Sequence, residues 1–96
     1  MTSPFSLRTT PRYERLARGL RRGHPEFEAL QERAGAILTA DPFNRTRSHR
    51  IRKLEAVPSG EGQWRLSLGR FRFRYDVYGD EVVLRYCGLR REDTYR

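Results

Sequence analysis

The fold is decided by the stretch from Trp64 to Tyr78, which reads Trp-Arg-Leu-Ser-Leu-Gly-Arg-Phe-Arg-Phe-Arg-Tyr-Asp-Val-Tyr. Apolar and polar residues alternate along it with a period of two, which is typical of a half-buried β-strand. The apolar residues change phase at Gly69-Arg70. Because glycine adopts turn conformations that other residues resist, this change predicts a turn between two antiparallel strands.

Three arginines fall on one face of the second of these strands. Arg70, Arg72 and Arg74 alternate with aromatic residues, so the strand period places them on the face opposite the aromatic rings, about 7 Å apart. An ordinary solvated strand face more often mixes both signs of charge, although a solubilising or salt-bridged face is the alternative. We interpret the three guanidinium groups as an anion-binding face.

The composition fits one globular domain spanning residues 1–96, long enough to bury about two-thirds of its unfolded surface. The net charge is +8, and residues 45–96 hold twelve arginines and Lys53 against seven acidic residues. Such a basic half favours a polyanionic partner, nucleic acid first. Arginine outnumbers lysine nineteen to one. Arginine holds phosphate through two hydrogen bonds but does not accept a proton near neutral pH.

Several classes of chemistry find no support in the sequence. Two histidines twenty-five positions apart and Cys87 in an apolar strand make no zinc site. No glycine-rich phosphate loop precedes a helix, and no nucleophile elbow is present. We therefore expect neither a metal nor a cofactor. No apolar run is long enough to span a membrane, and the N-terminus does not resemble a signal peptide, which predicts a soluble cytoplasmic protein.

The order of patterns predicts an α+β fold. Thr9-Thr10-Pro11 is typical of a helix start, and a second helix follows from Pro25 to Asp41-Pro42. Beyond the basic run 44–53, we expect the main sheet to begin near Leu54, and residues 82–87 form its last strand. The prediction is an N-terminal helical hairpin packed on an antiparallel meander of three strands, with residues 5–8 as a candidate fourth strand at one edge.

The pieces occur in a recognisable order. After the helical hairpin, the sequence contains Lys53-Leu54, Trp64–Leu68, Phe71–Tyr75, Asp80–Leu84 and Gly88–Arg96. This order resembles the RelE/ParE toxin superfamily of bacterial toxin–antitoxin systems, and we favour the RelE-like branch. The resemblance covers nearly the whole chain, and the part from Trp64 onward carries most of it.

The resemblance implies two helices on one face of a curved antiparallel sheet of three to four strands. It also implies a metal-independent endoribonuclease whose other, concave face binds messenger RNA in the ribosomal A site. There the 2′-hydroxyl attacks the adjacent phosphate and leaves a 2′,3′-cyclic phosphate. This cleavage of the messenger RNA inhibits translation. The implied partners are the ribosome, messenger RNA and a cognate antitoxin that forms a hetero-oligomer with the toxin; no membrane is involved.

Site residues carry over position by position. Arg72 matches the family's strand arginine, which stabilises the phosphorane charge. Either Arg90 or Arg91 matches the arginine near the C-terminal motif, a phosphate clamp or leaving-group donor, and the spacing leaves this choice open. Tyr95 matches the terminal tyrosine, which stacks on a base or assists proton transfer, and Lys53 matches the basic position before the first sheet strand. The RNA-binding set consists of Arg50, Arg52, Arg70, Arg74 and His49. The candidate proton acceptors are Lys53, His49, Tyr95, Asp93 and Glu92.

Two other functions fit the same sequence. A ParE-like toxin that poisons DNA gyrase without cleaving RNA would share the fold, and a non-catalytic RNA-binding module would satisfy the charge alone. Individual residues also have structural alternatives: Arg72 could pair with Asp76 or Asp80, His49 could be an exposed loop residue, and Trp64 is expected to pack in the core.

Overall fold

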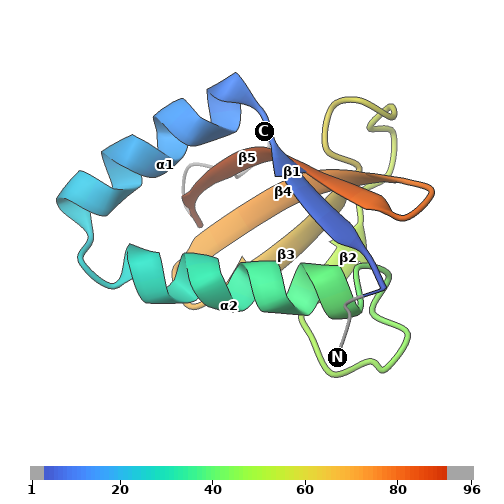
Figure 1. Cartoon of the computed structure of the whole chain (residues 1–96). Coiled ribbons are helices and arrows are strands. Elements are labelled where there is room, and N and C mark those ends of the chain that lie inside the picture. Colours follow the sequence, from blue (N-terminus) through green and yellow to red (C-terminus); the bar gives the residue numbers. More distant parts are fainter. Residues whose placement is uncertain (1–3, 91–96) are drawn as a thin grey trace.

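Two helices cover one face of a five-stranded sheet in the computed structural model, which describes residues 4–90 (Figure 1). The elements in chain order are β1 (Ser6–Thr9), α1 (Pro11–Gly23), α2 (Phe27–Ala40), β2 (Ile51–Lys53), β3 (Trp64–Leu68), β4 (Phe71–Tyr78) and β5 (Glu81–Leu89). The predicted α+β class and helical hairpin are confirmed. Neither helix within residues 4–90 has the length and apolar character needed to cross a bilayer.

The sheet differs from the prediction in size and in direction. Its strand order is β1-β5-β4-β3-β2, so it has five strands rather than three to four. Strands β2 to β5 form an antiparallel meander of four strands where three were expected. Strand β1 lies at one edge, as the candidate strand of residues 5–8 predicted, but it pairs with β5 in parallel, which makes the sheet mixed. The first main strand is Ile51–Lys53 and ends before Leu54, because the basic run itself supplies the residues that pair with β3.

Both helices bury their apolar stripes against the same face of the sheet. Helix α1 begins where expected, since the Thr10 hydroxyl accepts a hydrogen bond from the Tyr13 backbone N–H at 3.2 Å. The buried core contains Tyr13, Ala17, Phe27, Ala34, Leu38, Leu66, Phe71, Phe73, Tyr75, Val82, Leu84 and Cys87. Trp64 packs against this core as predicted. Burial raises the pKa of the Cys87 thiol to about 12, as expected of an inert buried cysteine.

A β-bulge in β5 sets which side chains face away from the helices. Arg74 pairs with Tyr86, whereas the next residue, Tyr75, pairs with Leu84, so Arg85 is the extra residue on β5. The bulge shifts the alternation of β5 by one position. Leu84 and Cys87 consequently both point into the core, and Tyr86 and Gly88 lie on the opposite face.

The loop between α2 and β2 is built around Asp41. Its carboxylate accepts hydrogen bonds from the backbone N–H groups of Arg45 and Thr46 at 2.8 and 3.1 Å and from the Thr46 hydroxyl at 2.7 Å. The Asn44 side chain binds both the N–H and the C=O of His49. These contacts fix the path of the basic run that leads into β2.

Candidate nucleic-acid interface

The face of the sheet opposite the helices, here called the open face, carries two adjoining rungs of polar residues. Strand pairing places Arg52, Arg65, Arg74 and Tyr86 side by side on the first rung. The second rung contains Arg50, Ser67, Arg72 and Gly88, with the Ser67 N–H donating to the Arg50 carbonyl at 2.9 Å. Arg90 follows Gly88 by two residues, so it extends the same face beyond the second rung.

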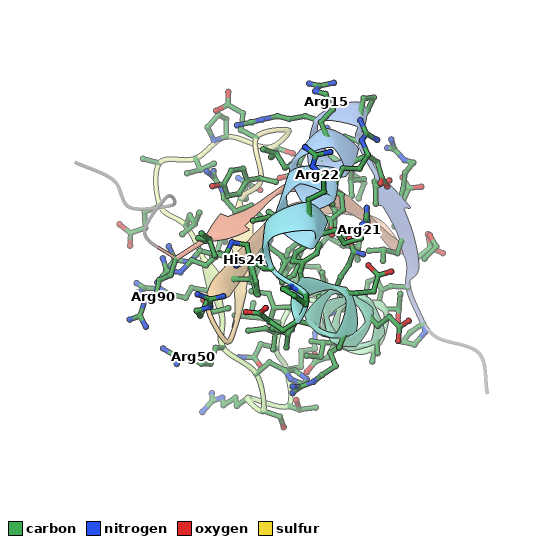
Figure 2. All side chains as sticks on the ribbon, turned by 90° about the vertical axis from the view of Figure 1, so that its left-hand side faces the viewer. Arg15, Arg21, Arg22, His24, Arg50 and Arg90 are labelled. Carbon is green, nitrogen blue, oxygen red and sulfur yellow. The ribbon has the colours of Figure 1, made fainter. Side chains whose placement is uncertain are left out.

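Five arginines from these rungs and their continuation surround one hollow of about 350 Å³. We call this hollow the arginine pocket; its lining residues are Arg50, Ile51, Arg52, Arg65, Ser67, Arg72 and Arg90. Arg65 and Arg72 are half-buried, and Arg50, Arg52 and Arg90 are exposed around them. Figure 2 shows Arg50 and Arg90 on the same side of the molecule, directed away from both helices.

The charge of the arginine pocket determines what it can bind. Five guanidinium groups give the described lining of the hollow a concentrated positive charge, which favours an anion. Each guanidinium is a planar fork of donors that matches two oxygens of a phosphate. The arrangement is therefore suited to a phosphodiester, which the half-buried Arg65 and Arg72 and the exposed rim arginines Arg50, Arg52 and Arg90 can hold.

The loop of residues 54–63 is bound to the part of the open face that carries Asp76 and Arg74. The Asp76 carboxylate, only 1% exposed, accepts hydrogen bonds from the backbone N–H groups of Gly60, Gly62 and Gln63 at 3.0 to 3.1 Å and from Arg85 Nε at 2.9 Å. Burial raises the pKa of the Asp76 carboxyl, but the hydrogen bonds from the Gln63 N–H, Arg85 and the Gly62 N–H outweigh burial and hold that pKa below its usual value.

Arg74 fastens the same loop. Its Nε donates to the Gly62 carbonyl at 3.2 Å, and a terminal nitrogen donates to the Glu61 carbonyl at 2.9 Å. Gly62 has a φ of 83°, and a Cβ there would approach the Arg74 Cβ to 3.0 Å. Arg74 thus lies on the predicted face. Its hydrogen bonds there are made to the loop and hold it in place, whereas the sequence predicted an RNA-binding role.

Arg70 does not lie on the open face, so the expected line of three arginines is wrong. It occupies the two-residue turn after Gly69, outside the alternation of β4. Its guanidinium donates to the Glu26 carboxylate at 2.5 Å and lies 3.0 Å from His24 Nδ1, at the start of α2. The hydrogen bond from Arg70 lowers the pKa of the Glu26 carboxyl. Of the three arginines, only Arg72 lines the arginine pocket.

Lys53 and His49 are also separated from Arg72, which corrects their expected grouping with it. Lys53 pairs with Trp64, so it faces the side opposite Arg52, and its Nζ lies 5.8 Å from the centre of the Trp64 ring. His49 is held in the α2–β2 loop, with Nε2 3.9 Å from the Asp41 carboxylate. Neither residue lines the arginine pocket.

The remaining predicted positions divide between the pocket and the chain end. Arg50, Arg52, Arg72 and Arg90 are brought together. Arg91 and Tyr95 lie outside the described residues, as do Glu92 and Asp93. Among residues 4–90, no group of three or more His, Cys, Asp or Glu side chains is arranged to hold a metal ion.

The sequence interpretation missed three residues of the open face. Arg65 and Ser67 occupy the polar positions of the alternating stretch Trp64–Leu68, so the period that identified Arg72 could have found both. Tyr86 belongs to the apolar run of residues 82–87, and its place on the open face depends on the bulge at Arg85. No pattern in the sequence marks that bulge.

The arrangement of the elements is that of the RelE-like fold. Superposition on a solved structure supports this: the chain resembles a chain of the archaeal RelE–RelB complex from Pyrococcus horikoshii OT3 with a TM-score of 0.65 and 18% sequence identity. The similarity covers 91% of this chain and 96% of that one. No protein-family model matches the sequence, and no curated protein matches it. The structural similarity establishes the fold that the resemblance predicted.

Proposed function

We propose that this chain is the toxin of a toxin–antitoxin pair, and that it inhibits translation by cleaving messenger RNA on ribosomes in the cytoplasm. The observation that carries the proposal is the arginine pocket, where five guanidinium groups line one hollow. Such a lining is suited to binding a phosphodiester. The RelE-like fold supports it, because the similar structure is of RelE in complex with RelB.

The pocket suits cleavage by the RNA itself. The 2′-oxygen forms a bond to the adjacent phosphorus, the bond from phosphorus to the 5′-oxygen breaks, and the products are a 2′,3′-cyclic phosphate and a 5′-hydroxyl. The phosphorane between them carries more negative charge than the starting diester. In this proposal Arg72, a half-buried arginine of the pocket lining, stabilises that additional charge. Donors that gain strength in the transition state accelerate the reaction.

Proton transfer requires a group that the described lining of the pocket does not contain. Its polar side chains are guanidinium groups and the Ser67 hydroxyl, and guanidinium does not accept a proton near neutral pH. The acceptor in this proposal comes from residues 91–96, with Tyr95 first. We expect Tyr95→Phe to slow cleavage and alter its dependence on pH while binding of the RNA is retained. A pH–rate profile of both proteins identical in shape and height would remove Tyr95 from this role.

The partner protein follows from the same surface. An antitoxin that presents acidic residues can neutralise the arginine pocket, and a segment that folds on binding can cover a large part of the open face. A hetero-oligomer of toxin and antitoxin is the form in which the chain is stored without harm.

The proposal is tested by inducing the chain in bacteria and mapping new messenger 5′ ends by primer extension. We compare the wild type with the double variant Arg50→Ala/Arg90→Ala, which removes two rim arginines of the pocket. The matched control Arg15→Ala/Arg33→Ala removes two exposed charges from the helices, and Figure 2 shows Arg15 far from Arg50 and Arg90. New ends within translated codons are expected for the wild type and the control, and not for the pocket variant.

Two outcomes would contradict the nuclease. Growth arrest without new 5′ ends would favour the ParE-like alternative, which a gyrase supercoiling assay then checks. Equal cleavage by the pocket variant and the control would show that the arginine pocket does not hold the scissile strand.

A further inference from the structure

A second hollow lies on the open face beside the arginine pocket. It has a volume of about 410 Å³ and is lined by Thr10, Pro11, Arg12, Gly60, Glu61, Arg74 and Arg85. It therefore lies between the first turn of α1 and the loop of residues 54–63. Three of its lining residues are arginines and one is an acid, so it too favours an anion.

Tyr86 neighbours residues that line the two hollows. On one side, Arg12 places its guanidinium carbon 5.5 Å from the centre of the Tyr86 ring, and Arg74 is the cross-strand neighbour of Tyr86. On the other side, the Tyr86 ring extends along β5 over Gly88, which pairs with Arg72. Tyr86 itself lines neither hollow, but Arg12 and Arg74 line the second and Arg72 lines the first, so the ring lies next to lining residues of both.

Gly88 makes room for the ring. A Cβ at position 88 would overlap the Tyr86 hydroxyl and would lie 2.8 Å from the ring carbon that carries it. Only glycine therefore permits the ring to lie flat against the strand in this direction. The Tyr86 residue is half-buried.

Each arginine near the Tyr86 ring has different contacts. Arg85 is bound to Asp76 and to the Tyr78 hydroxyl, and Arg74 holds the loop carbonyls of Glu61 and Gly62. Arg12 is exposed in the first turn of α1 and already lies against the ring. An aromatic ring flanked by an arginine is the arrangement by which single-stranded nucleic acid is held, through base stacking and phosphate contact.

We propose that Tyr86 and Arg12 form a second nucleotide subsite, in which a base stacks on Tyr86 and the adjoining phosphate binds Arg12. This inference rests on the proposed function, because it places the next nucleotide of the strand whose scissile phosphate occupies the arginine pocket. Glu61 also lines the hollow, and its negative charge disfavours a phosphate close to it.

The test uses two probes that cannot be cleaved. A nucleoside 3′,5′-bisphosphate fills the arginine pocket alone, and a 2′-deoxy trinucleotide reaches both hollows. We expect Tyr86→Leu to weaken trinucleotide binding by about fivefold to a hundredfold, the usual effect of one stacked base, and to leave bisphosphate binding unchanged. The matched variant Tyr86→Phe keeps the ring and is expected to bind the trinucleotide like the wild type.

Two further variants separate stacking from a general loss of structure. Gly88→Ala alone is expected to weaken trinucleotide binding, because the added Cβ displaces the ring. Added to the Tyr86→Leu variant, which has no ring to displace, it is expected to change the trinucleotide affinity little further. Arg12→Gln is expected to lower the slope of log affinity against log salt by about 0.7, the value for one phosphate contact on a single strand.

The failure of this inference is distinguishable from the failure of the proposed function. If Arg72→Ala loses bisphosphate binding while Tyr86→Leu binds the trinucleotide like the wild type, the second subsite is wrong and the arginine pocket stands. If the wild type binds neither probe, both proposals fall.

Discussion

Arg72→Ala is expected to slow cleavage of messenger RNA on programmed ribosomes by about 10²- to 10³-fold, the usual cost of removing one donor to a charged transition state. Arg72 is the half-buried arginine of the pocket on the central strand β4. Its neighbours Arg50, Arg52 and Arg90 are exposed and can hold flanking phosphates in both ground state and transition state. The loss is therefore expected mainly in the single-turnover rate at saturating ribosome concentration, with a smaller effect on binding.

Two companion variants sharpen this experiment. Arg72→Lys keeps the positive charge but loses the two-pronged geometry of guanidinium, so an intermediate rate is expected. Arg33→Ala removes an exposed charge from α2 and is expected to leave the rate unchanged. Wild-type cleavage by a folded Arg72→Ala protein would show that the chemistry takes place elsewhere.

The alternation along Trp64–Tyr78 was sufficient to predict the two central strands and the faces of most of their residues. It placed Phe71, Phe73 and Tyr75 in the core and Arg72 on the other face, as the structure has them. The same rule failed at Arg70, because a residue in a two-residue turn does not follow the strand period. There the ion pair with Glu26 decides the direction of the side chain.

The site depends on two features of register that single residues do not reveal. A shift of one residue moves a side chain to the other face of a sheet, and Lys53 lies one position from Arg52, which lines the pocket. Unless the first residue of β2 is known, the sequence pattern does not show whether Arg52 or Lys53 lies on the same face as Arg72. Similarly, the bulge at Arg85 shifts the alternation of β5 and thereby brings Tyr86 to the open face.

Asp76→Asn is expected to lower the free energy of unfolding at pH 7 by about 3 kcal/mol, the lower end of the cost of breaking a buried ion pair. The Asp76 carboxylate is 1% exposed and accepts four hydrogen bonds, including one from Arg85. An asparagine keeps one acceptor oxygen and turns an N–H group toward the backbone donors, so Arg85 and part of the loop lose their partner. In a domain of this size the melting temperature should fall by at least about 10 °C.

The effect should depend on pH in a direction set by the Asp76 pKa, which lies below its usual value in the folded protein. A carboxyl with a lowered folded pKa stabilises the protein above its unfolded pKa, about 3.9, and this contribution is lost as pH falls through the folded pKa. Urea unfolding of both proteins should therefore show a large difference at pH 7 that shrinks below about pH 4. The control Asp80→Asn changes an exposed turn residue and should match the wild type. If Asp76→Asn also matched it at pH 7, the loop would not depend on this carboxylate.

A destabilised loop should in turn weaken trinucleotide binding, because the loop contributes Gly60 and Glu61 to the second hollow. The loop contributes no residue to the arginine pocket, which should therefore keep its affinity for the bisphosphate.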